Sequence, residues 1–190
     1  MTTSTRTRFL ERMLPPDAIL NVILPDGTVK VFQGDQPMRV RYVNRQDKSD
    51  PMNGAVMADA DKLAELLEGR RKRAPFIADL TGDNGFELMI GLGGELGCAQ
   101  YSQADGEPPY LMAVSPHLPP IRAGYVEFLA ASTPTPLAAR YIISFDELKQ
   151  VACHFLDTGG RSDVVSWQEF HPAAAREDAH RASRSRNRTE

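Results

Sequence analysis

Residues 142–170 read IISFDELKQVACHFLDTGGRSDVVSWQEF, a stretch that carries the start and stop signals of a helix and then a strand. Ser144 and Glu147 have the spacing of a capping box, in which each side chain accepts a backbone N–H at the start of a helix. Gly159 can adopt the left-handed conformation with which helices end. Between them, apolar residues recur at the spacing of one buried helical stripe: Phe145, Leu148, Val151, Ala152, Phe155 and Leu156. The pattern predicts an amphipathic helix over 144–157.

A strand is predicted over 164–170, after the polar turn that follows the glycines. Side chains alternate between the two faces of a strand, so Val165, Trp167 and Glu169 share one face. Trp167 has two interpretations. It either fills the core beneath the helix or anchors a partner protein, with Glu169 placed to pair with an arginine or lysine of that partner.

This helix, its FLDTGGRS stop and the strand with Trp167, Gln168 and Glu169 resemble the first-described immunity-protein family of bacterial polymorphic toxin systems, which has a Trp-Glu motif near its C-terminus. The segments ADADKLAELLEG, FELMIGLG and YSQADGEPPYLMAV are also similar to that family, and the resemblance covers residues 38–170. It implies an inhibitor that binds a co-encoded toxin, most often of the nucleic-acid deaminase type. It does not say which toxin.

Composition favours one soluble domain. The chain has 190 residues, 42% of them hydrophobic and 25% charged, without a bias typical of another class. No apolar run reaches the length of a signal sequence or membrane span, so we expect a cytoplasmic protein. Residues 1–170 hold 17 basic and 22 acidic side chains, a net charge of −5, which could complement a basic toxin or simply aid solubility. Cys98 and Cys153 are expected to be free thiols.

The N-terminal part predicts a flexible segment over 1–15 and a hairpin from two β-rich runs, 19–24 and 28–32, around Asp26-Gly27. A further strand is predicted over 38–43. The hairpin is expected to add an edge to the sheet of a single domain over 16–170.

The middle of the chain predicts a helix over 59–69, capped by Asp59 or Asp61, and a strand meander. Cations at 70–73 suit either a helix C-terminus or a phosphate-binding patch. Residues 132–136 (STPTP) are predicted to form a linker, and 171–190 a disordered arginine-rich tail. The expected strands are 76–80, 86–92, 96–102, an edge strand at 110–114, and 125–129.

Catalytic and ligand-binding motifs are weak. The glycine run at 91–97 has Leu96 where a dinucleotide fingerprint needs its third glycine, so a hairpin turn is the better interpretation. Cys153 and His154 are adjacent on a helix and point about 100° apart, which does not suit a nucleophile and its base. The four histidines share no metal-ligand spacing. We expect no catalytic residues, no metal and no cofactor.

The sequence thus predicts an α+β fold, an antiparallel sheet of six or seven strands with both helices on one face and the other face partly available. The leading hypothesis is a non-enzymatic, monomeric immunity protein that binds its toxin one-to-one and blocks the active site. Its candidate contacts are two aromatic anchors and several carboxylates: Trp167, Tyr101, Glu169, Glu87, Glu95, Asp105 and Glu107. One alternative is a small-molecule-binding or enzymatic domain with a pocket beneath residues 108–120. Another is a nucleic-acid-binding module that uses 70–73 and the tail.

Overall fold

The computed structural model describes residues 19–23, 29–33, 38–117 and 124–170. The chain divides into two compact units, residues 1–37 and 38–190. In the first, β1 (Ile19–Ile23) and β2 (Val29–Gln33) form the predicted antiparallel hairpin, with Ile19 opposite Gln33. These strands pair with each other as a two-stranded sheet. The expectation that they add an edge to the main sheet stays a prediction. The predicted segments 1–15 and 171–190 lie outside the described residues.

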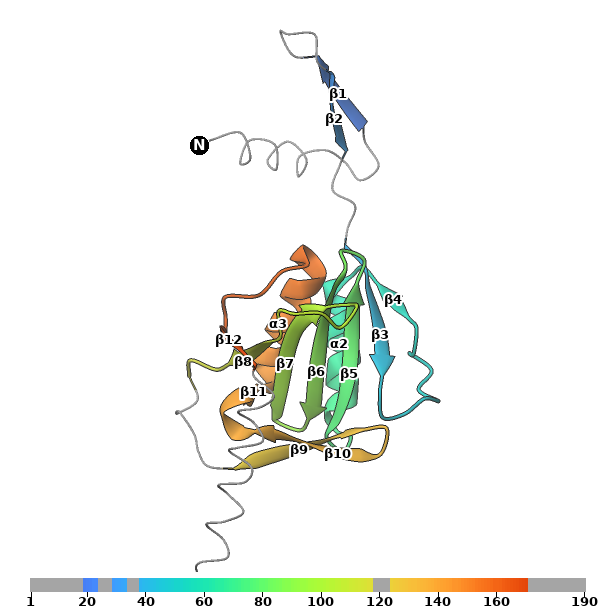
Figure 1. Ribbon diagram of the computed structural model, residues 1–190. Coiled ribbons are helices and arrows are strands. Elements are labelled where there is room, and N and C mark those ends of the chain that lie inside the picture. The colour runs from blue at the N-terminus through green and yellow to red at the C-terminus, as the bar shows by residue number, and fades with distance from the viewer. Residues whose placement is uncertain (1–18, 24–28, 34–37, 118–123, 171–190) are drawn as a thin grey trace, which may run out of the picture. The chain divides into compact units, whose positions relative to one another are not determined.

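The second unit is built on a ten-stranded sheet, and the α+β prediction is confirmed (Figure 1). Its long antiparallel core has the order β3-β5-β6-β7-β8-β12, and two-residue strands pair at its margins. These short strands and β10 account for the excess over the six or seven strands expected. The strands are β3 (Val40–Asn44), β4 (Val56–Met57), β5 (Phe76–Gly82), β6 (Phe86–Gly93), β7 (Leu96–Gln103), β8 (Leu111–Val114), β9 (Tyr125–Ala130), β10 (Thr133–Ala138), β11 (Ile143–Ser144) and β12 (Ser166–Glu169).

Both predicted helices cover one face of this sheet (Figure 1). The first, α2 (Ala60–Arg71), is capped by Asp59, whose carboxylate accepts from the N–H groups of residues 61 and 62. The second, α3 (Phe145–Thr158), has the full capping box and ends at Gly159 with φ +68°. Its predicted stripe is buried against β5–β7, and a short 3₁₀ turn, η1 (Ala139–Tyr141), precedes it.

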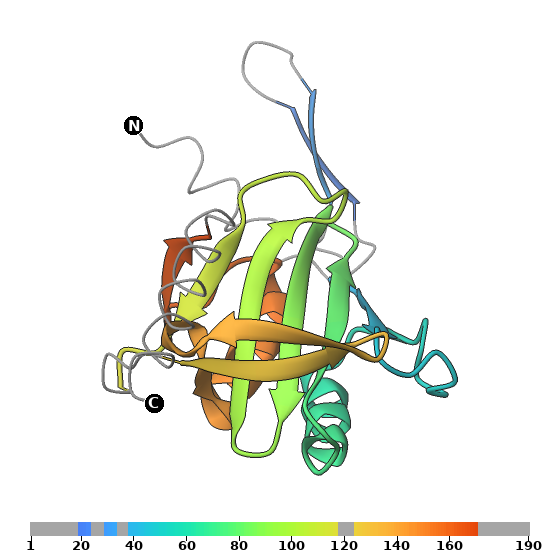
Figure 2. The same ribbon diagram turned by 60° about the horizontal axis from the view of Figure 1, so that its bottom comes forward.

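The opposite face is partly covered by the β9–β10 hairpin, which crosses β5–β7 (Figure 2). A small second core lies there, formed by Ile77, Cys98, Phe128 and Ile142. Gly91 permits the close approach, because a Cβ at this position would lie 2.4 Å from Cys98 Sγ and 2.8 Å from the Phe128 ring. The face opposite the helices is therefore closed at one end and open at the other.

The predicted linker over 132–136 is wrong, because residues 133–136 lie in β10. They pair with β9 through a two-residue turn at Ala131 and Ser132, whose φ angles are +48° and +65°. Pro134 and Pro136 are tolerated because β10 pairs on one side only, and an edge strand needs no N–H on its free side.

The predicted edge position of β8 is also wrong. β12 pairs with β8, with Trp167 opposite Ala113, and so β12 is the edge strand. β12 is shorter than the predicted 164–170, because a turn occupies 163–165. Both cysteines are free, as predicted, with Cys98 buried and Cys153 half-buried.

Candidate partner-binding surface

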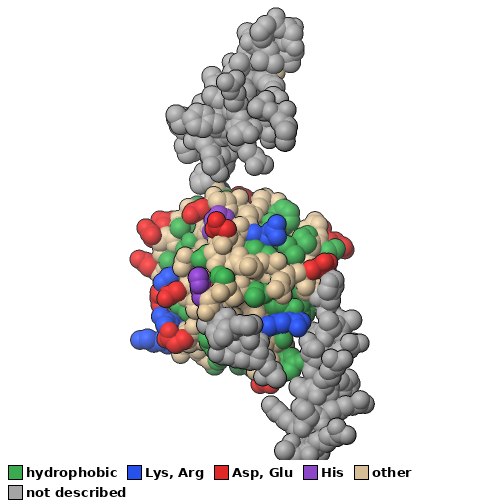
Figure 3. Space-filling view, turned by 90° about the vertical axis from the view of Figure 1, so that its left-hand side faces the viewer, with side chains coloured by type: hydrophobic (Ala, Val, Ile, Leu, Met, Phe, Trp, Pro, Cys, Tyr) green, Lys and Arg blue, Asp and Glu red, His purple; other side chains and the backbone are tan. Residues whose placement is uncertain are grey.

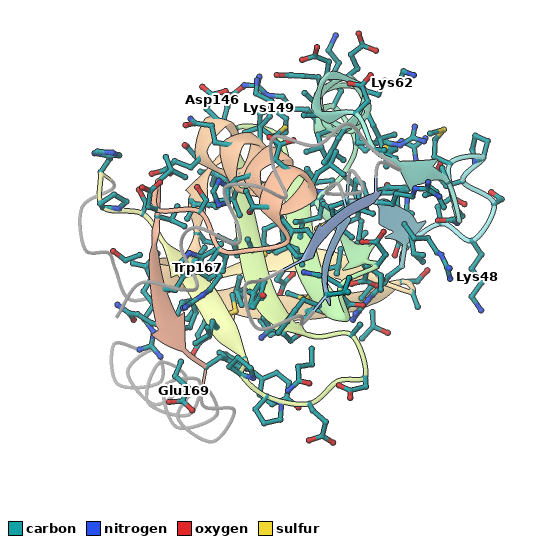
Figure 4. The ribbon with its side chains drawn as sticks, turned by 90° about the horizontal axis from the view of Figure 1, so that it is seen from above. Lys48, Lys62, Asp146, Lys149, Trp167 and Glu169 are labelled. Atoms are coloured by element: carbon teal, nitrogen blue, oxygen red, sulfur yellow. The ribbon has the colours of Figure 1, made fainter. Side chains whose placement is uncertain are left out.

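Trp167 lies on the side of β12 that faces the body of the fold (Figure 4). Its ring packs edge-on against Tyr101, with centroids 6.2 Å apart, and its Nε1 donates to the Ser162 carbonyl oxygen at 2.8 Å. The residue is half-buried and contacts the main core. The geometry thus gives Trp167 a clear packing role and leaves part of the indole exposed.

Tyr101 is 7% exposed and lies at the centre of this aromatic cluster. It stacks on Phe86 at 5.0 Å and meets Phe155 edge-on at 6.0 Å. Its hydroxyl donates to the Gly159 carbonyl oxygen at 3.3 Å, and burial raises its pKa above the usual value. Tyr101 therefore links β7 to the end of α3 and has a packing role within the fold.

Three of the candidate carboxylates belong to one end of the sheet. Asp105 and Glu107 are exposed in the β7–β8 loop, where Glu107 N donates to Asp105 Oδ1 at 3.1 Å. Glu169, also exposed, ends β12 opposite Leu111, and the next N–H, of Phe170, donates to the Tyr110 carbonyl oxygen at 2.7 Å. Figure 4 places Glu169 at the periphery of the molecule.

Glu95 lies elsewhere, in the β6–β7 turn at the opposite end of the sheet, where it forms an ion pair with Arg71. The structure therefore does not bring the five predicted acidic contacts into one patch. Figure 3 shows acidic and basic side chains mixed over the β12 side of the molecule.

Glu87 lies on the uncovered part of the sheet face. Successive pairings place Arg41 opposite Thr81, Thr81 opposite Glu87, and Glu87 opposite Ser102, and we call these four residues the open row. Side chains at matched positions project to one face, and these project away from the helices. A parallel row that includes Ile77 and Cys98 is the one covered by the β9–β10 hairpin.

A charged cluster stands at the border between the two rows. Arg45 Nε donates to Asp79 Oδ2 at 2.5 Å, and its terminal nitrogen lies 3.4 Å from Glu87 Oε1. Thr81 Oγ1 donates to Glu87 Oε2 at 3.3 Å. Burial raises the pKa of Asp79 despite the Arg45 contact, and burial together with the Asp79 charge raises that of Glu87. Asp79 Oδ1 is buried without a hydrogen-bond partner.

Sequence interpretation missed Asp79 and Arg45. A visible signal was the lone charge within the otherwise apolar strand FIADLTG, because a buried carboxylate needs a partner. The partner itself lies 34 residues away and depends on strand pairing.

The cations at 70–73 are mostly engaged within the fold. Arg70 and Arg73 form ion pairs with Asp50, whose side chain has no exposed surface, and Arg71 pairs with Glu68 and Glu95. Lys72 is exposed. This arrangement favours the helix-terminus interpretation of the basic run over a free phosphate-binding patch.

Two of the cavities on the described part of the molecule have linings of both polar and apolar side chains. One of about 380 Å³ is lined by Asn44, Gln46, Asp47, Arg73, Ala74, Phe76 and Leu129. The other, of about 280 Å³, is lined by Arg39, Arg41, Val56, Thr81, Gly82 and Asp83. The alternative hypothesis placed a ligand pocket beneath residues 108–120. These two cavities have other linings, and residues 118–120 lie outside the described residues. Within the described ranges, no three His, Cys, Asp or Glu side chains gather as they would around a metal ion.

Comparison with known protein families gives a match. The model of the immunity protein family Imm1 matches residues 48–169, more than half of the chain. The chain belongs to the Imm1 family of immunity proteins. The matched span contains both helices and every strand of the main sheet except β3, and it includes Trp167 and Glu169. No curated protein matches the chain. Over the part of this Imm1 protein that the structure describes, no helix has the length and apolar character needed to cross a membrane.

Proposed function

We propose that this Imm1 protein neutralises a toxin encoded beside its own gene, by binding it and without catalysing a reaction. Immunity-protein family membership supports a toxin as the partner. The observation that carries the proposal is the open row, a polar stretch of sheet in which Arg41 is exposed, Thr81 and Glu87 are half-buried and Ser102 is buried. It is backed by a fully packed core. Because its strands are held on both sides, this surface is preformed and little ordering entropy is lost on binding.

The toxin is proposed to be a nucleic-acid deaminase, and the complex a one-to-one assembly in the cytoplasm, where such a toxin meets its substrate. The chain would cover the toxin's active site or the path of its substrate. A stable interface of this kind buries on the order of 1,200 to 2,000 Å². The open row alone is too small, so the interface extends beyond it.

The proposed contacts extend from Glu87 toward the β7–β8 loop and β12. Asp105, Glu107 and Glu169 are exposed there and could steer a basic toxin surface. The exposed part of Trp167 is the candidate anchor. Tyr101 would support that anchor from within the core, while Glu95, at the far end of the sheet, would contribute only at long range.

The decisive experiment is co-purification with the product of the adjacent gene, together with a growth-rescue assay when that product is expressed. We expect a stable complex and rescue. Thr81→Arg, which places a bulky cation in the open row, should weaken both. Gln150→Arg, on the exposed side of α3, should leave both unchanged. Absence of toxicity and of complex would refute the proposal. Equal behaviour of the two variants would move the interface away from the open row.

A further inference from the structure

The cavity of about 280 Å³ adjoins the open row and shares Arg41 and Thr81 with it. Its second arginine, Arg39, precedes β3 and lies on the same side of the chain as Arg41, because Val40 between them is fully buried on the helix side. Both arginines are exposed. The sheet therefore presents two guanidinium groups at the mouth of one cavity.

These two arginines differ from the other arginines around them. Arg45, Arg70, Arg71 and Arg73 each form ion pairs within the fold. In the described part of the chain neither Arg39 nor Arg41 has an ion-pair partner, although Asp83 lines the same cavity. Their positive charge is thus available to a group outside this chain.

An aliphatic wall accompanies the charges. Val56 is 59% exposed, one of three large hydrophobic residues so exposed among those described, and it pairs with Arg41 across β3 and β4. Arginine next to exposed apolar surface is characteristic of protein interfaces. The cavity combines recognition of an anion with a surface for the carbon atoms beside it.

We propose that this cavity, the Arg39–Arg41 pocket, receives an aspartate or glutamate side chain of the toxin. A carboxylate matches the fork of a guanidinium, and the methylene groups of the same segment would pack on Val56. The inference rests on the proposed function. It also reverses the charges expected at this part of the surface. Here the toxin supplies the negatively charged side chain and the immunity protein supplies the positively charged ones.

A protein carboxylate fits better than nucleic-acid phosphate. Asp83 lines the pocket and Glu87 stands in the adjoining row, so an extended polyanion would meet two carboxylates. Residues 1–170 also carry a net charge of −5, which repels nucleic acid at long range. A single carboxylate on a neutral or basic partner meets Asp83 but not Glu87, and it avoids the long-range repulsion.

The test measures the affinity of the full-length chain for the purified, catalytically inactivated toxin by calorimetry. We expect R39E/R41E to weaken binding at least about tenfold, as loss of a paired charge at an interface does. R39K/R41K should fall in between, since lysine keeps the charge but lacks the bidentate fork. K62E/K72E reverses two exposed cations and should stay near wild type. Lys62 lies on α2, on the helix-covered side (Figure 4), and Lys72 is the C-cap residue of the same helix. Thermal unfolding verifies that all variants fold.

Each other outcome has a distinct meaning. Full affinity of R39E/R41E would overturn this inference and leave the proposed function standing. If K62E/K72E weakens toxin binding as much as R39E/R41E does, the inference is also overturned. The loss of affinity would then come from the long-range electrostatic field of the protein and not from a local pocket. If the wild type alone binds a labelled oligonucleotide and R39E/R41E abolishes that binding, the pocket binds nucleic-acid phosphate and the inference is wrong. If the wild type itself binds no toxin, the proposed function falls and this inference falls with it.

Discussion

At the scale of single residues, Asp50 is a buried carboxylate whose contacts stabilise the fold. Its side chain is fully buried, accepts hydrogen bonds from Asn44 Nδ2 and Met52 N at 3.0 Å each, and forms an ion pair with Arg70. Removing one member of a buried ion pair costs about 3 to 5 kcal/mol. Asp50→Asn should therefore lower the free energy of unfolding by about that much in urea titrations, with the exposed Asp157→Asn as the neutral control.

The pH dependence of this contribution has a definite sign. Burial opposes ionisation of Asp50, but the hydrogen bonds from Asn44 and Met52 and the charges of Arg70 and Arg73 outweigh it and lower the pKa. Stability from Asp50 is thus complete above about pH 4 and is lost as the pH falls through the folded pKa. Asp50→Asn should flatten the acid limb of the stability curve, and an unchanged acid limb would contradict the assignment.

Asp79 is expected to behave in the opposite way. Burial raises its pKa, so its ionised form is less favourable in the folded state than in the unfolded state, and stability falls as the pH rises through the window above about pH 4. Asp79→Asn should therefore raise the free energy of unfolding more at pH 7 than at pH 5. Urea titrations at pH 5 and pH 7 measure it, with Asp163→Asn as the exposed control. Destabilisation at pH 7 would mean that the Arg45 contact dominates.

Separate measurements of stability and toxin binding can show whether Trp167 serves the core or the interface. Truncating a tryptophan that packs on the core costs about 3 kcal/mol, whereas Trp167→Phe keeps most of the packing and loses one hydrogen bond of about 1 kcal/mol. Trp167→Ala should lower the thermal midpoint strongly, and Trp167→Phe only slightly. If Trp167→Ala unfolds like wild type and fails only in toxin binding, the ring serves the interface.

At the scale of elements, the β9–β10 turn stores backbone strain. Ala131 and Ser132 both adopt positive φ, a conformation that costs non-glycine residues about 1 kcal/mol or more. A131N/S132G installs the sequence that this turn type prefers and should stabilise the protein by about 1 kcal/mol. Gly94→Ala is the converse, because Gly94 has φ +64° in open space and should lose a similar amount. The free energy of unfolding of both variants is measured by chemical denaturation. If A131N/S132G and Gly94→Ala change it in the same direction, the strain argument is contradicted.

The helices and strands that were predicted correctly from the sequence have their start, stop and turn residues within one short segment. Helix α3 has its capping box, apolar stripe and terminal glycine within one short segment, and the β5–β7 meander has turn residues between apolar runs. β10 was missed because its two prolines resemble a linker and its turn lacks asparagine or glycine. The position of β12 beside β8 was missed because that pairing joins segments about 50 residues apart, and no local pattern encodes it.

At the scale of the whole molecule, the layering on the far face was the least predictable feature. Phe128 reaches Gly91 and Cys98 only because the β9–β10 hairpin turns back over the sheet, a consequence of the entire chain path. The open row and the Arg39–Arg41 pocket exist because that hairpin stops short of them. The acidic contacts predicted from sequence lie at two ends of the sheet. Their positions depend on strand pairing and register, which decide which charged side chains become neighbours.

The division of the chain into two units leads to the last prediction. Among the described residues, the buried side chains of the larger core lie between Val40 and Val165, and the Imm1 match begins at residue 48. A fragment of residues 38–190 should therefore fold with a thermal midpoint within about 3 °C of the full chain, the shift that about 1 kcal/mol produces at this size. It should also rescue growth against the toxin. A fragment that is stable but fails to rescue would assign a toxin contact to residues 1–37, whereas an unstable fragment would mean that those residues belong to the folding unit.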